Sequence, residues 1–121
     1  MTEVKNSKQY DLEERTLRFA KEIIEFVRIL PKTMANIEIM KQIIRSSGSV
    51  GANYIEANEA LSKRDFLMRI KICRKESKES RYWLKLIEVR GEDTEKGRQS
   101  LLNEATELMK IFGSIVEKTK H

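Results

Sequence analysis

Apolar residues recur at intervals of three and four along almost the whole chain, and a single proline, Pro31, interrupts the pattern. This spacing places the apolar side chains on one face of an α-helix, so it predicts amphipathic helices. Only five of the 121 residues are glycine, which favours long helices over many turns. A chain of this length forms one domain of common size. We therefore predict an all-α fold in a single domain, residues 1–121.

Local signals divide the apolar pattern into four helices. Pro31 ends the first, because proline lacks an amide donor and restrains the residue before it. Ser62, followed by Asp65 three residues later, is typical of a helix N-cap, and Gly91 is typical of a helix end. The predicted helices cover about residues 11–30, 36–60, 63–89 and 94–118, and residues 1–10 and 119–121 are expected to be flexible. The short connections predict an antiparallel, up-down-up-down four-helix bundle.

Histidine-based catalysis is not expected, because the only histidine, His121, stands at the end of the sequence. Two acid pairs, Glu56 with Glu59 and Glu76 with Glu79, have the spacing of acids in di-metal helical bundles. Such sites also place a histidine three residues after a glutamate, and that histidine is missing here. We therefore expect no metal, no cofactor and no enzymatic activity.

Cys73 is the only cysteine, so it cannot form an internal disulfide, and its apolar neighbours along the helix predict a buried thiol. The first residues lack the apolar stretch of a secretory signal, and no apolar run is long enough to span a membrane. A reducing, cytoplasmic location without membrane attachment is expected.

Small residues fill the segment Ser46–Asn53. One interpretation is a glycine-rich phosphate loop, but the Gly-Lys-Ser/Thr ending and a preceding strand are missing. The alternative is a stretch of helix that a neighbouring helix approaches closely. Each glycine inside a helix costs about 1 kcal/mol, so dense packing is expected at this segment.

Positive charge is concentrated in one segment. Residues 62–90 contain ten basic and four acidic side chains, whereas the whole chain has a net charge of +5. At about 100° per residue, Lys63, Arg64 and six further cations share one arc of the third predicted helix, roughly 120° wide. We call these six residues the basic stripe: Lys71, Arg74, Lys75, Lys78, Arg81 and Lys85.

A stripe of this kind is the expected electrostatic footprint of a protein that binds the phosphate backbone of RNA or DNA. The alternative is a solvated helix face that keeps the domain soluble. Tyr82 falls within the basic arc. As aromatic residues at helical spacing, however, Tyr82 and Trp83 are expected to pack in a core or an interface rather than to stack on bases.

Polar residues at steps of three and four share one face of the second predicted helix. Together with residues of the third helix they are predicted to form a buried polar cluster. In it, Arg45 or Arg69 pairs with Glu56 or Glu79, and the serine and asparagine add hydrogen bonds. The alternative is that Arg45 and Glu56 reach solvent. The predicted cluster consists of Arg45, Ser49, Asn53, Glu56, Arg69 and Glu79.

The third predicted helix has more apolar residues than one buried seam requires. Ile72, Trp83 and Leu86 flank the main seam. This surplus indicates a second buried contact, so a homo-oligomer is expected.

Several motifs together resemble a known family. They are Gln42-x-x-Arg45-Ser46-x-x-Ser49-Val50-x-x-Asn53-x-x-Glu56, Ser62-x-x-Asp65-Phe66, Glu79-x-x-x-x-Leu84, Asp11-Leu12, Ala20 and Leu30-Pro31. Over nearly the whole chain, the set resembles the four-helix-bundle family encoded in intervening sequences of bacterial 23S ribosomal RNA genes. The chain departs from the commonest family pattern at Gly51, where proline is frequent, at Ala57, where glycine is frequent, and in the segment Arg74-Lys75-Glu76-Ser77.

The resemblance implies a non-enzymatic protein that assembles as a barrel-shaped homopentamer. The family is related to accessory proteins of diversity-generating retroelements, which bind nucleic acid and a reverse transcriptase. Two classes of function follow for this chain. One is a nucleic-acid-binding accessory protein that holds RNA or DNA on the basic stripe, and the other is an oligomeric scaffold that binds a protein partner.

Overall fold

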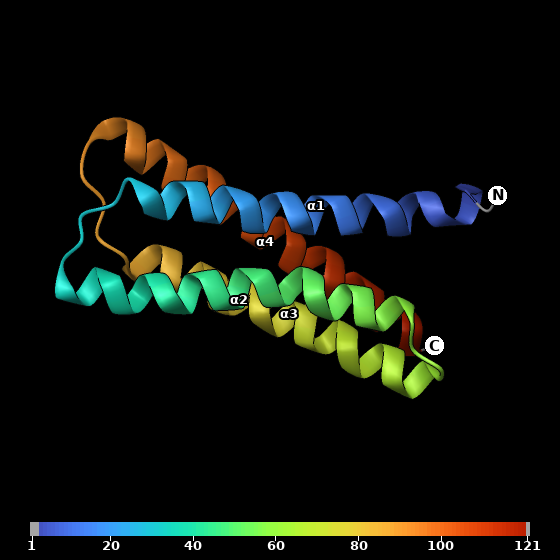
Figure 1. Ribbon diagram of the computed structural model, residues 1–121. Coiled ribbons are helices and arrows are strands. Elements are labelled where there is room, and N and C mark those ends of the chain that lie inside the picture. Colours follow the sequence, from blue (N-terminus) through green and yellow to red (C-terminus); the bar gives the residue numbers. More distant parts are fainter. Residues whose placement is uncertain (1–2, 121) are drawn as a thin grey trace.

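The computed structural model describes the backbone of residues 3–120 and the side chains of residues 11–120. These residues form four helices and no strand: α1 (Glu3–Arg28), α2 (Met34–Asn58), α3 (Lys63–Leu86) and α4 (Glu92–Lys120) (Figure 1). Consecutive helices run in opposite directions. The predicted all-α, antiparallel four-helix bundle is confirmed.

Helix bounds differ from the prediction by a few residues, and most at the start of α1. This helix begins at Glu3 rather than near residue 11, because residues 3–10 contain no glycine or proline that would stop it. α4 follows directly on Gly91, whose φ of +92° suits glycine. Ser62 caps α3 as predicted, since its Oγ accepts from the amide of Asp65 at 3.0 Å. Flexibility of residues 1–10 and 119–121 stays a prediction, and residues 1, 2 and 121 lie outside the described part of the chain.

A side chain of α4 binds the C-terminal end of α3. It stops at Leu86 rather than residue 89, and Ile87 has extended backbone with φ −67° and ψ 142°. Arg98 of α4 donates to the carbonyl oxygens of Ile87 at 2.7 Å and Leu84 at 3.4 Å. A cation that binds the last carbonyl groups of a helix stabilises that end, because these groups lack partners within the helix.

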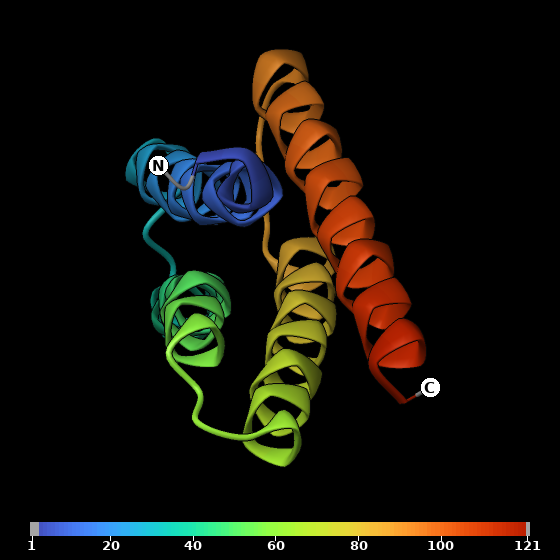
Figure 2. The same ribbon diagram turned by 90° about the vertical axis from the view of Figure 1, so that its right-hand side faces the viewer.

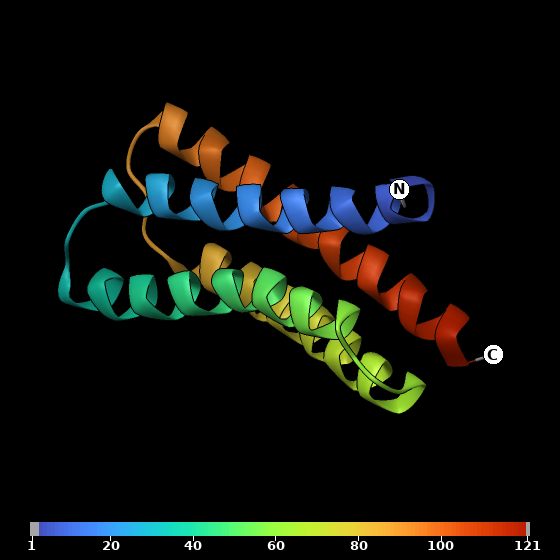
Figure 3. The ribbon, with the colours of Figure 1, turned by 45° about the vertical axis from the view of Figure 1, so that its right-hand side comes forward.

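The helices pack unequally. α3 packs along α2 and along α4, whereas α4 crosses α1 and contacts it over a short stretch (Figures 2 and 3). A bidentate ion pair joins α1 to α4, in which Arg15 Nε and Nη2 donate to the two carboxylate oxygens of Glu104 at 2.7 and 2.9 Å. These hydrogen bonds raise the pKa of the Arg15 guanidinium above its ordinary value.

All four helices contribute to one apolar core. The rings of Tyr54 and Phe112 are in tilted contact there, with their centroids 5.7 Å apart. Cys73 is buried as predicted, its Sγ donates to the carbonyl oxygen of Val50 at 3.4 Å, and burial raises the pKa of the thiol to about 12. The largest fully buried apolar side chains are Phe19, Ile23, Ile43, Ile70, Leu84, Ile87, Leu108 and Phe112.

A buried asparagine joins two connections at one end of the bundle. Asn36 Nδ2 donates to the carbonyl oxygens of Pro31 at 3.0 Å and Glu88 at 2.9 Å, and its Oδ1 accepts from the amide of Glu88 at 2.9 Å. Pro31 lies between α1 and α2, and Glu88 lies between α3 and α4. One side chain that is 1% exposed therefore holds both connections together.

Helices α1 and α2 approach each other closely at Gly51. A Cβ atom added to Gly51 would lie 2.9 Å from Thr16 Oγ1 and 3.2 Å from Thr16 Cβ, whereas one added to Gly48 would meet nothing within 4 Å. Thr16 is buried, and its hydroxyl donates to the carbonyl oxygen of Leu12 at 2.7 Å, which restrains it. Dense packing in the segment 46–53 therefore involves Gly51 and spares Gly48.

Alanine substitutions at these two glycines are expected to have different effects on stability. Both substitutions gain about 1 kcal/mol of helix propensity, so Gly48→Ala should stabilise the protein by about that amount. Gly51→Ala also overpacks the contact with Thr16, which costs about 1–3 kcal/mol. The Gly51→Ala protein should therefore be less stable than the Gly48→Ala protein by the cost of this overpacking. Urea unfolding measures both variants, and equal transition midpoints would contradict the close contact at Gly51.

Candidate nucleic-acid interface

The basic stripe forms one wall of a groove between α3 and α4. Its volume is about 460 Å³, and α4 contributes Met109, Val116 and Lys120. Five of the six stripe residues line the groove: Lys71, Arg74, Lys75, Lys78 and Arg81. Lys85 is exposed on α3 and does not line it. No acidic side chain of the described residues lines this groove, so it presents cations above an apolar floor.

The two arginines of the groove differ in burial, because Arg74 is exposed whereas Arg81 is not. Arg74 lies against α4 at Gly113, where a Cβ atom would be 3.6 Å from Arg74 Nε. Arg81 is half-buried, and its Nε is buried without a hydrogen-bond partner in the described structure. Lys71, Lys75 and Lys78 are exposed. Positively charged side chains are therefore presented both within the groove and at its edge.

The charge of the stripe is uncompensated. Between residues 11 and 120, the ion pairs of the structure involve other cations, and none includes a residue of the basic stripe. Free cations that share one concave surface raise the local concentration of anionic ligands. The groove is therefore electrostatically suited to a phosphate-rich polymer.

Tyr82 does not pack in the core, which was one of the two places expected for it, and its packing in an interface stays a prediction. Its side chain is exposed, while Trp83 is half-buried against the core. The two rings meet edge to face, with their centroids 5.0 Å apart and their planes inclined by 75°. The helical pattern had already separated the two residues, because it placed Tyr82 within the basic arc and Trp83 beside the apolar seam.

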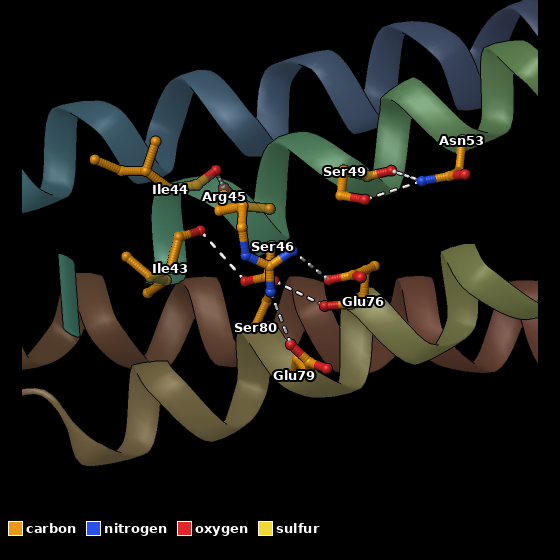
Figure 4. Close-up of polar contacts among 10 residues, drawn as sticks. Ile43, Ile44, Arg45, Ser46, Ser49, Asn53, Glu76, Glu79 and Ser80 are labelled. Carbon is orange, nitrogen blue, oxygen red and sulfur yellow. Dashed lines mark hydrogen bonds and ion pairs between the residues drawn. The ribbon is translucent and has the colours of Figure 1, made fainter. Parts of the chain in front are cut away.

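Most of the predicted polar cluster meets along the seam between α2 and α3 (Figure 4). Arg45 Nη2 donates to Glu79 Oε1 at 3.1 Å, and Arg45 Nη1 lies 3.8 Å from Glu76 Oε1. About two turns further along α2, Asn53 Nδ2 donates to the carbonyl oxygen and to the Oγ of Ser49, both at 2.9 Å. Arg69 Nη1 donates to Asn53 Oδ1 at 2.8 Å. Arg45 therefore takes Glu79 as its partner, and Arg69 takes Asn53.

The cluster differs from the prediction in two respects. Glu56 is exposed and makes no hydrogen bond or ion pair with the described side chains, so it lies outside the network. The Arg45 and Glu79 side chains are 55% and 36% exposed, so their ion pair lies at the surface of the chain rather than in the interior. Long arginine and glutamate side chains bury their stems and keep their charged ends in water.

Glu76 is a buried acid of this seam that the predicted cluster did not include. Its side chain is only 7% exposed, and its Oε1 lacks a hydrogen-bond partner in the described structure. Beside it, the hydroxyl groups of Ser46 and Ser80 are 2.9 Å apart (Figure 4). The signal was its register, because Glu76 follows Cys73 by three residues and precedes Ser80 by four, which places all three on the inward face of α3.

Exposed apolar side chains lie mainly on α1 and α2 rather than on α3. Ile72 and Trp83 are half-buried, and among the three flanking residues of α3 only Leu86 is exposed. On α2, by contrast, Ile37, Ile44 and Ile55 follow one face at 41%, 41% and 51% exposure. The surplus on the third helix is therefore smaller than its sequence indicated.

Two further findings bear on function. Among the described residues, no group of three or more histidine, cysteine, aspartate or glutamate side chains is arranged to hold a metal ion. None of the described helices carries an apolar stretch that could cross a membrane.

Comparisons with known proteins agree with this fold. Residues 8–114 match the family model described as 23S rRNA-intervening sequence protein. A crystal structure from Bacteroides thetaiotaomicron VPI-5482, described as a protein with unknown function from the S23 ribosomal protein family, is 33% identical to this chain. It superimposes with a TM-score of 0.78 over 91% of this chain and 98% of that one. No curated protein matches the chain. With its family match extending over most of its length, the chain belongs to the 23S rRNA-intervening sequence protein family.

Proposed function

We propose that this protein is a non-enzymatic nucleic-acid-binding protein that holds the sugar-phosphate backbone of RNA in the groove between α3 and α4. The observation that carries the proposal is the lining of the groove, which combines five cations of the basic stripe with Lys120 and no described acid. Each phosphate that such cations neutralise releases condensed counterions, and this release drives association. The related structure has unknown function, so the groove itself is the basis of the proposal.

Binding is expected to depend little on base sequence. The groove offers lysine and arginine side chains along the surface of α3, and contacts of these side chains to phosphates position a nucleic acid without reading its bases. None of the described elements has the form of a motif that reads base edges in a groove of DNA. The function is therefore retention of RNA rather than recognition of one sequence.

Titration of a labelled single-stranded RNA with the protein at several salt concentrations tests the proposal. We expect binding at about 50 mM salt. The logarithm of the association constant should fall linearly with the logarithm of the salt concentration, with a slope set by the number of phosphates contacted. Absence of binding at that concentration would overturn the proposal. Loss of binding when Lys71, Lys75 and Lys78 are replaced by glutamate would show that the RNA binds in the groove.

A second candidate function is an oligomeric scaffold that binds a protein partner. The observation that favours it is the exposed row of Ile37, Ile44 and Ile55 on α2, because exposed apolar rows mark association surfaces. This candidate would be favoured over the first if the chain binds a protein partner with an affinity that does not depend on salt and fails to bind RNA.

Self-association is a separate proposal and is compatible with both functions. The same apolar row supports a homo-oligomer, and the family resemblance implies a pentamer. A ring of copies would repeat the basic stripe and increase RNA affinity through multivalency. Light scattering at micromolar concentration is expected to give a multiple of the 14.2 kDa chain mass, and the mass of one chain would contradict self-association.

A further inference from the structure

Tyr82 is an aromatic side chain that the core does not use. It is 59% exposed, and it is the only exposed aromatic side chain among residues 11–120. Its ring rests against the ring of Trp83, which is half-buried and packs against the core. This contact restrains the Tyr82 ring while more than half of the residue's surface stays in solvent. A restrained, exposed ring is a surface on which a flat ligand group can stack.

The position of Tyr82 relates it to the cations. Lys78 precedes it by four residues and Lys85 follows it by three, so all three side chains leave the same face of α3. Both lysines are exposed. Proteins that bind single-stranded nucleic acids combine these same two features, a cationic groove that follows the backbone and aromatic rings on which bases stack.

We propose that Tyr82 stacks on an unpaired base and thereby makes the groove selective for single-stranded RNA. This inference rests on the proposed function and adds the strand class to it. In a duplex, both faces of each base are covered by its neighbours, so a protruding tyrosine ring finds no base to stack on. In a single strand the bases turn outward while the phosphates follow the cations. The duplex is also too stiff to follow a short concave groove between two helices.

The test compares three anionic ligands by fluorescence anisotropy at one salt concentration. They are an oligouridylate, an RNA duplex with the same number of phosphates, and inorganic polyphosphate of similar length, which carries charge without bases. The parent protein should bind the oligouridylate most tightly. Tyr82→Ala should bind it about 5- to 150-fold more weakly, which is the range for loss of one stacked base. Binding of the duplex and of polyphosphate should not change.

Two further variants separate stacking from a structural role. Tyr82→Phe keeps the aromatic ring and should bind the oligouridylate as the parent does. Tyr82→Leu keeps an apolar contact to Trp83 but has no aromatic face, so it should lose as much affinity as Tyr82→Ala. Equal thermal midpoints of all variants would show that each is folded.

The outcomes distinguish this inference from the proposed function. Unchanged oligouridylate binding by Tyr82→Ala, or equal losses for all three ligands, would overturn the stacking role while the groove remains an RNA site. Tighter binding of the duplex than of the oligouridylate by the parent would also overturn it. If the parent binds none of the three ligands, the proposed function fails and this inference fails with it.

Discussion

Replacement of Lys71, Lys75 and Lys78 by glutamate is expected to weaken RNA binding by about 100-fold or more at 50 mM salt. All three lysines line the groove, are exposed and form no ion pair with a described acid, so each is free to bind a phosphate. The substitution removes three such contacts and adds three charges that repel the backbone. The slope of the logarithm of affinity against the logarithm of salt should fall by about three, or one for each lysine. Anisotropy titrations at several salt concentrations measure both quantities.

A matched control separates the groove from the net charge of the protein. Lys21, Lys96 and Lys110 are exposed, lie outside the groove and form no ion pair with a described acid. Their replacement by glutamate changes the net charge by the same amount. We expect only a small loss of affinity and a nearly unchanged salt slope in this control. Equal losses in the two triple variants would show that RNA responds to the overall charge and not to the groove.

Replacement of Asn36 by alanine is expected to destabilise the protein by about 2–3 kcal/mol, because three part-buried backbone groups lose the hydrogen-bond partner that this buried side chain supplies. These groups are the carbonyl oxygens of Pro31 and Glu88 and the amide of Glu88. Asn36→Asp should also destabilise strongly, because a carboxylate cannot donate to the two carbonyl oxygens. Urea unfolding followed by circular dichroism measures the change in the free energy of unfolding.

Thr33→Ala is the control variant for Asn36→Ala. Thr33 is the N-cap of α2, the helix that contains Asn36. Thr33 Oγ1 accepts from the amide of Asn36 at 3.1 Å, and loss of such a cap costs about 1 kcal/mol. The bridge between the two connections remains intact in this variant. Should Asn36→Ala unfold at the same urea concentration as Thr33→Ala, the bridge between the connections would contribute no more than a helix cap, which contradicts the expected loss.

Local sequence signals were sufficient to predict the four helices and the basic stripe. Pro31, Ser62 and Gly91 act within a few residues of their own positions, so they mark helix ends without knowledge of the fold. The stripe is local as well, because residues three and four apart share a face of one helix whatever packs against it. The end of α3, by contrast, depends on Arg98 of another helix, which a local pattern does not include.

What the sequence by itself determined is therefore the set of amphipathic helices and the face on which each residue lies. The tertiary structure decided which faces meet. Only the packing of α3 against α4 turns the stripe into the wall of a groove with Lys120 opposite, and only the rotation of α3 against α2 buries Glu76 while it leaves Glu56 outside the cluster. Asn36 bridges to Glu88, 52 residues away. Such choices depend on how helices rotate and cross to fill one core, and side-chain packing over all four helices settles them together.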